Sequence, residues 1–295
     1  MTSPTITVAV WNLTSTYLGA TRDYDAVSDI VASYAPDAYL QQHNTASLQP
    51  TRRMAGRLGM QEHLPFPNPV PDADIATTLY LNHTFTDAVF QAHSAPWWIH
   101  PCHVMVRVGD CPTPLNLLSL HLCPFDAAQR SSEAAWLSTL ALPGMVTLAA
   151  GGMASYPRGP EKHTPPSWER ESERARAIQR TWVGVDGQRR GDTGPDAALK
   201  DAGYLDLAQH AAEDLHQPHA LTPTEGHRQT CQACRCGLQR TDRVYGVGGI
   251  HQALTAVEVI DSNAVLDAGG HALLLVKLNL RALEKVLVET TVPPW

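Results

Sequence analysis

The segment Thr147-Leu-Ala-Ala-Gly-Gly-Met-Ala-Ser-Tyr-Pro157 begins as an apolar run and ends in small residues and a proline. Residues 145–150 have the length and apolar composition of a strand. The strand is followed by Gly151-Gly152-Met153-Ala154, so the positions at its end carry no charged or hydrogen-bonding side chain. Any chemistry at this end of the fold must therefore come from the ends of other strands.

The segments on either side of this strand alternate between strand and helix patterns. Residues 5–12 are rich in β-branched residues, residues 23–35 place apolar side chains on one helix face before Pro36, and residues 37–43 form a short second strand. This order predicts a crossover unit and an α/β sheet. Further strands are predicted at 75–81, 104–108, 115–121, 241–247, 254–260 and 272–280, and further helices at 47–58, 125–142 and 196–212 with a break at Gly203.

Length and composition set the class of protein. The chain has 295 residues, of which 43% are hydrophobic, and it shows no repeat or linker, so we expect one domain spanning residues 1–295. A net charge of −7 argues against general nucleic-acid binding, which relies on lysine and arginine. The sequence has no signal-peptide pattern and no apolar run approaching 18 residues, so a cytoplasmic, bacterial protein that does not enter a membrane is expected.

Six motifs, in order along the chain, resemble those of the endonuclease/exonuclease/phosphatase (DNase-like) superfamily. They are Val10-Trp11-Asn12, Pro36-Asp37 with Gln42, Ser119-Leu120-His121-Leu122, Gly151-Gly152-Met153-Ala154, Arg240-Thr241-Asp242-Arg243-Val244-Tyr245 and Gly269-Gly270-His271. The resemblance implies a four-layer α/β/β/α sandwich, in which two mixed β-sheets pack face to face between helices. It also implies catalytic roles. Asn12 would help to position a metal, His121 would contact a phosphate, and Asp242 would orient His271.

The chain departs from the superfamily where that family holds magnesium. The family's metal-binding Glu is replaced by His43, its Asp and Asn by Gly152 and Ala154, and another Asp by Gly270. Magnesium takes oxygen ligands, usually including carboxylates. A magnesium cofactor and ordinary nuclease activity are therefore not expected.

The histidines that remain suggest a different site. The resemblance implies that His43, His121 and His271 face one cleft, with Asp242 behind one of them. Three imidazoles supported by a carboxylate can bind Zn, Cu, Fe or Ni. The alternative is that the three histidines are relics that only fill space.

Three other groups of residues were considered. His227, Cys231, Cys234 and Cys236 have enough soft ligands for a structural zinc site, although a disulfide or free thiols in a loop would also explain them. The cluster at His100, Cys102 and His103 follows Trp97-Trp98 and is interpreted as packing, although the tryptophans could line a pocket for an aromatic or apolar ligand. The charged stretch 169–180 is interpreted as a solvated helix, with a nucleic-acid contact as the alternative.

Three functions fit these residues. The favoured one is a remodelled enzyme that acts on a small molecule, as in specialised metabolism, through the histidine-lined cleft. The second is a non-catalytic pseudo-nuclease that binds a ligand or a partner. The third is a phosphodiesterase or phosphatase with an atypical metal site. Neither the substrate nor the oligomeric state follows from the sequence.

Overall fold

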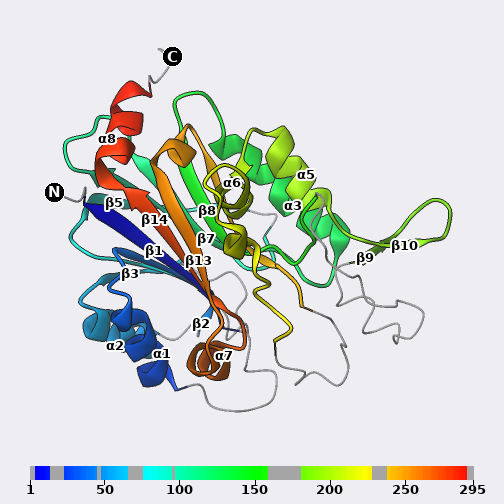
Figure 1. Cartoon of the computed structure of the whole chain (residues 1–295), viewed down its shortest axis with the longest axis horizontal. Coiled ribbons are helices and arrows are strands. Elements are labelled where there is room, and N and C mark those ends of the chain that lie inside the picture. The colour runs from blue at the N-terminus through cyan, green and yellow to red at the C-terminus, as the bar shows by residue number, and fades with distance from the viewer. Residues whose placement is uncertain are drawn as a thin grey trace.

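Two six-stranded β-sheets dominate the computed structural model of the chain (Figure 1). The structure describes residues 4–13, 23–44, 48–65, 76–94, 97–158, 181–227 and 238–290. In spatial order, the first sheet consists of β13 (Leu254–Ile260), β14 (Leu273–Asn279), β1 (Thr5–Asn12), β2 (Ala38–Asn44), β4 (Ala76–Leu81) and β3 (Gln61–His63). The second consists of β11 (Leu205–Asp206), β12 (Asp242–Val247), β8 (Val146–Gly152), β7 (Leu115–His121), β6 (Cys102–Val108) and β5 (Phe85–Gln91).

Each sheet is mixed, with one parallel pair near its centre. Strands β1 and β2 run parallel in the first sheet, and β7 and β8 run parallel in the second, while the remaining neighbours are antiparallel. A parallel pair needs a crossover connection, and α1 (Tyr24–Ser33) and α3 (Ala127–Trp136) supply the two crossovers. Strands β9 (Thr181–Val183) and β10 (Arg189–Gly191) form a separate two-stranded hairpin.

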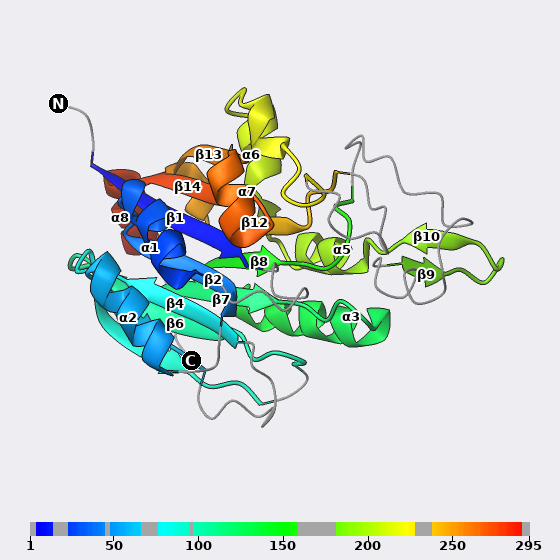
Figure 2. The same cartoon turned by 90° about the horizontal axis from the view of Figure 1, so that it is seen from below.

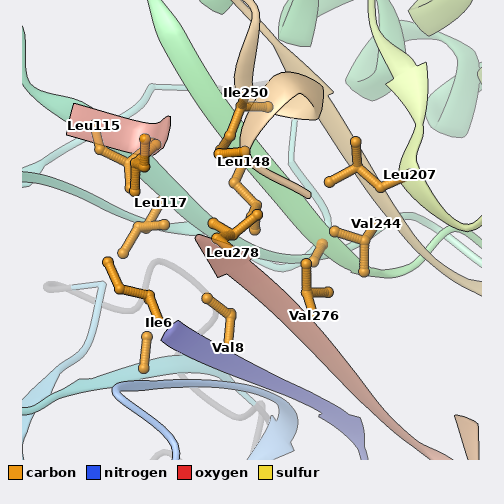
Figure 3. Packing of buried hydrophobic residues seen from close by; sticks show 14 of the residues in the cluster. Ile6, Val8, Leu115, Leu117, Leu148, Leu207, Val244, Ile250, Val276 and Leu278 are labelled. Atoms are coloured by element: carbon orange, nitrogen blue, oxygen red, sulfur yellow. The ribbon is translucent and has the colours of Figure 1, made fainter. Parts of the chain in front are cut away.

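The two sheets pack face to face through alternate residues of their strands, because side chains on a strand point to opposite faces in turn. Figure 3 shows this core, to which α6 (Leu207–Glu213) and the short 3-10 helix η5 (Ile250–Ala253) also contribute. Its labelled residues are Ile6, Val8, Val276 and Leu278 of the first sheet, Leu115, Leu117, Leu148 and Val244 of the second, and Leu207 and Ile250 of the helices.

Helices cover the outer face of each sheet, which completes four layers (Figure 1). Figure 2, seen from below, shows α1 in front of the first sheet. Helices α1, α2 (Leu48–Leu58) and α7 (Asn263–Gly269) bury apolar residues against Ala9 and Trp11 on the outward face of β1. Helix α3, the 3-10 helix η2 (Leu137–Leu140) and α5 (Gly194–Asp201) do the same against Leu118 and Leu120 of β7. The predicted α/β/β/α sandwich is confirmed.

Several predicted elements match in type and differ at their ends. The helix predicted at 23–35 ends at Ser33, with Asp23 as its N-cap. The helix predicted at 196–212 is interrupted at Gly203, whose φ is +93°, so that α5 and α6 flank the short strand β11. The start predicted at Ser47 lies outside the described residues.

Some elements have no counterpart in the sequence prediction. Strand β5 was missed because five of its seven residues, from Thr86 to Phe90, do not alternate cleanly between buried and exposed positions. The prediction also missed β3, β9, β10, α7, α8 (Leu280–Glu289) and the 3-10 helix η4 (Pro218–Leu221). Helix α8 follows β14 without a loop, and Asn279 is both the last residue of the strand and the N-cap of the helix. None of the described helices is long and apolar enough to cross a membrane.

Truncating the core between the sheets tests this arrangement. Leu117 has no exposed surface, so Leu117→Ala should lower the free energy of unfolding by about 2–5 kcal/mol in a urea titration. Leu142→Ala, at a residue that is 47% exposed, should change it by less than about 0.5 kcal/mol. Equal effects of the two substitutions would contradict the packing described here.

Candidate active site

Both sheets place polar side chains at the same end of the sandwich. Asn12 ends β1, and His43 lies near the end of β2. In the second sheet His121 ends β7 and pairs with Gly152 at the end of β8, which in turn pairs with Asp242 at the start of β12. Each parallel pair brings its two carboxyl ends together, so motifs far apart in the sequence meet at one edge.

A buried carboxylate, Asp242, is the centre of the hydrogen-bond network at this edge. Its Oδ1 accepts a bond of 2.8 Å from Asn12 Nδ2, and its Oδ2 lies 2.6 Å from His271 Nδ1. Its backbone N–H donates to Thr224 Oγ1 at 3.0 Å. Burial raises the pKa of Asp242, but the charge and hydrogen bond of His271 and the bonds from Asn12 and Thr224 outweigh burial and hold that pKa well below its usual value.

Because the Asp242 carboxylate is ionised and can only accept hydrogen bonds, Nδ1 of His271 carries the proton that they share. The His271 backbone carbonyl accepts a bond of 2.9 Å from Trp11 Nε1, which fixes the loop after α7. The predicted orientation of His271 by Asp242 therefore has the geometry that the sequence motifs implied.

A second carboxylate, Glu225, lies on the other side of the same imidazole. Its Oε1 is 4.0 Å from His271 Nε2, and its Oε2 accepts a bond of 2.8 Å from Thr241 Oγ1. Sequence analysis did not predict this residue, since it belongs to no motif. An isolated bridge between Glu225 and Gln239 brings it to the site.

His43 and His121 form a separate pair in which the Nε2 atoms are 2.9 Å apart. The rings meet edge to face, with centroids 4.3 Å apart, and both residues are buried. His121 Nδ1 lies 3.1 Å from the Leu122 carbonyl oxygen, which can only accept, so Nδ1 carries a proton. In the neutral tautomer His121 Nε2 is then an acceptor, and the proton between the rings belongs to His43.

The backbone at His43 is held in an unusual conformation. Its φ is +55°, a region that favours glycine, at an irregularity in the pairing of β2 between Gln41 and Asn44. Such a conformation costs on the order of 1–3 kcal/mol and persists only where the surroundings fix it. It turns the imidazole toward His121, so the strain and the histidine pair occur together.

Gly152 leaves no room for a side chain at the end of β8. A Cβ atom at this position would lie 2.6 Å from His121 Cδ2 and 2.9 Å from Asn12 Nδ2. Both distances are shorter than those that Cβ atoms keep from non-bonded atoms in proteins. The side chains of Asn12 and His121 therefore occupy the space in which a residue at position 152 would sit. The absence of a side chain at position 152 and the placement of His121 therefore depend on each other.

An aromatic residue, Trp98, packs beside His121. Its Nε1 donates to the His121 carbonyl oxygen at 2.8 Å, and its ring lies edge-on to the imidazole with centroids 5.6 Å apart. The buried Glu133 accepts from Trp98 N at 2.8 Å and from Cys123 N at 2.7 Å. One carboxylate thus fixes both the Trp98 loop and the segment that follows His121.

The structure describes all three histidines of the first predicted metal site but only His227 of the predicted zinc site. Across the described ranges, no group of three or more His, Cys, Asp or Glu side chains is arranged to hold a metal ion. Of the predicted triad, His43 and His121 are adjacent, whereas His271 is bonded to Asp242. For the predicted zinc site, His227 Nε2 lies 2.7 Å from the Pro223 carbonyl oxygen, and Cys231, Cys234 and Cys236 lie outside the described residues, as does the charged stretch 169–180.

The cluster at His100, Cys102 and His103 is made of packing residues, as predicted for its buried members. Cys102 and His103 are buried, and His103 Nε2 lies 2.9 Å from Asn116 Oδ1. The cluster also includes His93, whose Nε2 is 2.8 Å from His103 Nδ1. Burial lowers the pKa of His93 to about 4 and lowers that of His103 and His100.

No protein-family model matches the chain, and no curated protein matches it in sequence. Solved structures match it in fold. An AP endonuclease from Archaeoglobus fulgidus matches at 11% identity over 92% of this chain and 98% of that chain, with a TM-score of 0.59. An endonuclease/exonuclease/phosphatase from Beutenbergia cavernae matches at 14% identity over 93% and 71% of the two chains, with a TM-score of 0.58.

A third solved structure is a 3′ phosphatase, NExo, from Neisseria bound to a product DNA hairpin. It is 12% identical over 92% of this chain and 99% of that chain, with a TM-score of 0.58. At these identities the likeness establishes the fold. The chain therefore has the DNase-like α/β-sandwich fold of the endonuclease/exonuclease/phosphatase group, which the order of its motifs had indicated.

Adding one methyl group at position 152 tests the packing of the histidine pair. Gly152→Ala should displace the His121 ring, change the NMR signals of His43 and His121, and cost about 1–3 kcal/mol of unfolding free energy. Gly56→Ala is the matched control, because a Cβ there meets nothing within 4 Å. Unchanged imidazole signals in Gly152→Ala would show that the pair does not depend on this glycine.

The histidine cluster around His93 predicts how stability depends on pH. The unfolded chain binds protons at these histidines with a pKa near 6.5, whereas the folded chain binds them only at lower pH. The stabilisation is thus fully present above pH 6.5 and is lost as the pH falls toward 4, with a slope of at most about 1.4 kcal/mol per pH unit for each proton. His93→Leu should flatten this dependence in urea titrations between pH 7 and 4, and an unchanged slope would contradict the assignment.

Proposed function

We propose that the chain is an enzyme that acts on a small molecule by acid–base catalysis, with His271 as the group that transfers the proton. The observation that supports this most directly is the contact of 2.6 Å between His271 Nδ1 and Asp242 Oδ2. A buried carboxylate fixes the tautomer and orientation of an imidazole in this way at many catalytic sites. Asn12 contributes by donating a hydrogen bond from its Nδ2 to the other carboxylate oxygen of Asp242, Oδ1.

The chemistry follows from the positions of the two carboxylates. Since Nδ1 of His271 is committed to Asp242, proton transfer falls to Nε2. A neutral His271 accepts a proton there and becomes an imidazolium between Asp242 and Glu225, at 2.6 Å and 4.0 Å respectively. Two negative charges favour this cation, so His271 acts as the base in one step and returns the proton as the acid in the next.

The residues at this edge do not fit magnesium, which the fold family would imply. Both oxygens of Asp242 are engaged by Asn12 and His271, and the family's Glu is replaced by His43. The pair of imidazoles offers nitrogen where magnesium takes oxygen. The proposed mechanism therefore contains no magnesium-dependent step.

The ion pairs of the described arginines favour a small uncharged substrate over a nucleic acid. The three arginines that are buried in the described part of the chain are paired with aspartates. Arg130 pairs with Asp192 at 2.7 Å, Arg240 with Asp206 at 2.7 Å, and Arg243 with Asp196 at 3.6 Å. Their charges are thus neutralised inside the protein, where they do not serve a phosphate backbone.

The proposal predicts that His271→Gln abolishes turnover. A pool of small metabolites would be incubated with the wild type and with the variant, and consumption would be followed by untargeted mass spectrometry. We expect compounds that the wild type consumes to react about 100–10,000 times more slowly with His271→Gln, because the proton-transfer group is gone. His219→Gln, at an exposed histidine, should match the wild type.

Two outcomes would count against acid–base catalysis. If His271→Gln consumed the same compounds at the wild-type rate, His271 would not be the catalytic base. If compounds bound to the wild type without being consumed, the non-catalytic ligand-binding function would be favoured. Turnover of a generic phosphodiester with added manganese would instead favour an atypical phosphodiesterase.

A second candidate function is a transition-metal enzyme, and the His43–His121 pair favours it. In a tetrahedral site with metal–nitrogen bonds of about 2.0–2.1 Å, two ligand nitrogens lie roughly 3.3 Å apart. The Nε2 atoms of the pair are 2.9 Å apart, so a small ring movement and loss of the shared proton would suffice. Asn12 Oδ1, which is buried and has no hydrogen-bond partner within the described structure, would be available beside them.

Metal analysis separates the two candidates. Protein purified without a chelator or a His-tag would be analysed for Zn, Cu, Fe and Ni beside His43→Ala. Stoichiometric metal that disappears in the variant would establish the histidine pair as a metal site. Metal that is unchanged in His43→Ala would point instead to His227, Cys231, Cys234 and Cys236.

A further inference from the structure

Two aromatic residues, Trp98 and Phe125, form an apolar wall at the edge of the candidate site. Their ring centroids are 5.4 Å apart and their planes are nearly perpendicular, at 87°. Trp98 contacts His121 on its other side, with ring centroids 5.6 Å apart. The aromatic wall is therefore continuous with the histidine pair.

The wall is fixed in place before any ligand arrives. Trp98 is held at two points, by its backbone N–H on Glu133 Oε1 and by its Nε1 on the His121 carbonyl oxygen, both at 2.8 Å. Glu133 is fully buried and also accepts from Cys123 N, two residues before Phe125. A rigid aromatic surface loses little conformational entropy when a ligand binds to it.

The exposure of Phe125 is unusual for this chain. Trp97 and Trp136 pack against each other in the apolar cluster on the outer face of the second sheet, as tryptophans usually do. Phe125 instead leaves 50% of its surface in water. Over the part of the chain that the structure describes, it is the one aromatic residue among the large exposed hydrophobic residues.

We propose that Trp98 and Phe125 bind a neutral aromatic ring of the substrate, next to the reacting groups. This inference rests on the proposed function as a small-molecule enzyme. Two perpendicular rings form a corner in which a third ring lies flat against one and edge-on to the other. Both are preferred aromatic geometries, because the electron-rich face of one ring attracts the electron-poor edge of another.

The charges near the site favour a neutral ring over a phosphorylated one. Asp242 and Glu225 are acidic, and the side chain of Glu225 is 24% exposed, so it presents negative charge to the solvent side of the site. The buried arginines that could offset it are already paired with aspartates. An anionic substituent on the ring would therefore be repelled.

Binding of small probes tests this inference without requiring turnover. Indole and phenol, as neutral rings, would be titrated into labelled protein and followed by NMR, with phenyl phosphate and inorganic phosphate run beside them. We expect indole and phenol to shift the Trp98 Nε1–H signal and the His121 ring signals, and the phosphates to leave both unchanged. Trp98→Phe assigns the indole signal.

Variants show whether Phe125 provides the affinity. Phe125→Ala should weaken binding of indole about fivefold, which corresponds to the loss of one aromatic contact of about 1 kcal/mol. Because Phe125 is exposed, the variant should fold normally. Leu142→Ala removes a similarly exposed apolar side chain elsewhere and should leave the affinity unchanged.

The results overturn the inference if indole binds equally well to Phe125→Ala, or if the phosphates shift the His121 signals and the neutral rings do not. Failure of the aromatic-ring inference can also be distinguished from failure of the proposed catalysis. Ring binding that depends on Phe125 while His271→Gln keeps full turnover would remove only the acid–base role. Loss of turnover in His271→Gln without any ring binding would remove only the aromatic site.

Discussion

The buried carboxylate of Asp242 is the constraint on which the candidate site depends. It lies on β12 of the second sheet and accepts from Asn12 at the end of β1 in the first sheet, and it is also bonded to His271 in the loop before β14. An ionised group out of water is stable only when it is paired and hydrogen-bonded. Satisfying this one charge therefore ties the two sheets and the histidine loop together at the edge where the motifs meet.

Packing explains why position 152 carries no side chain. The space beside Gly152 is filled by His121 and Asn12, and His43 adopts a positive φ that turns its ring to His121. These features form one self-consistent arrangement, in which the histidine pair lies beside Asn12 and Gly152 at the ends of the central strands. The contact of 2.9 Å within this pair underlies both proposals, proton transfer at this edge and binding of a transition metal.

The aromatic wall and the acidic network divide the site into two chemically distinct parts. Trp98 and Phe125 lie on the side of β7, whereas Asp242, His271 and Glu225 lie on the side of β12. His121 joins the two parts through its contact with Trp98 and its pairing with Gly152. A ligand that spans both would place an apolar ring at one end and its reactive group at the other.

Much of the fold and part of the candidate site could be predicted from the sequence. Strand and helix periodicity gave the central strands of both sheets, and the order of the motifs indicated the sandwich and placed Asn12, His121, Asp242 and His271 at one edge. Motifs carry this information because each strand end is a local feature. Glu225 and Phe125 were not predicted as site residues. Glu225 belongs to no motif, and Phe125 is an ordinary loop residue.

The sequence by itself determined the central strands of both sheets, the helices α1, α2 and α3, and which polar residues end the central strands, because these depend on periodicity along a few consecutive residues. Only the tertiary structure decided that His43 pairs with His121, that Glu225 lies beside His271, and that Gly152 leaves no room for a side chain. These relations join residues on different segments, in part through the positive φ at His43 and the irregular pairing of β2. Such distances arise when the two sheets pack together, and no spacing along the chain encodes them.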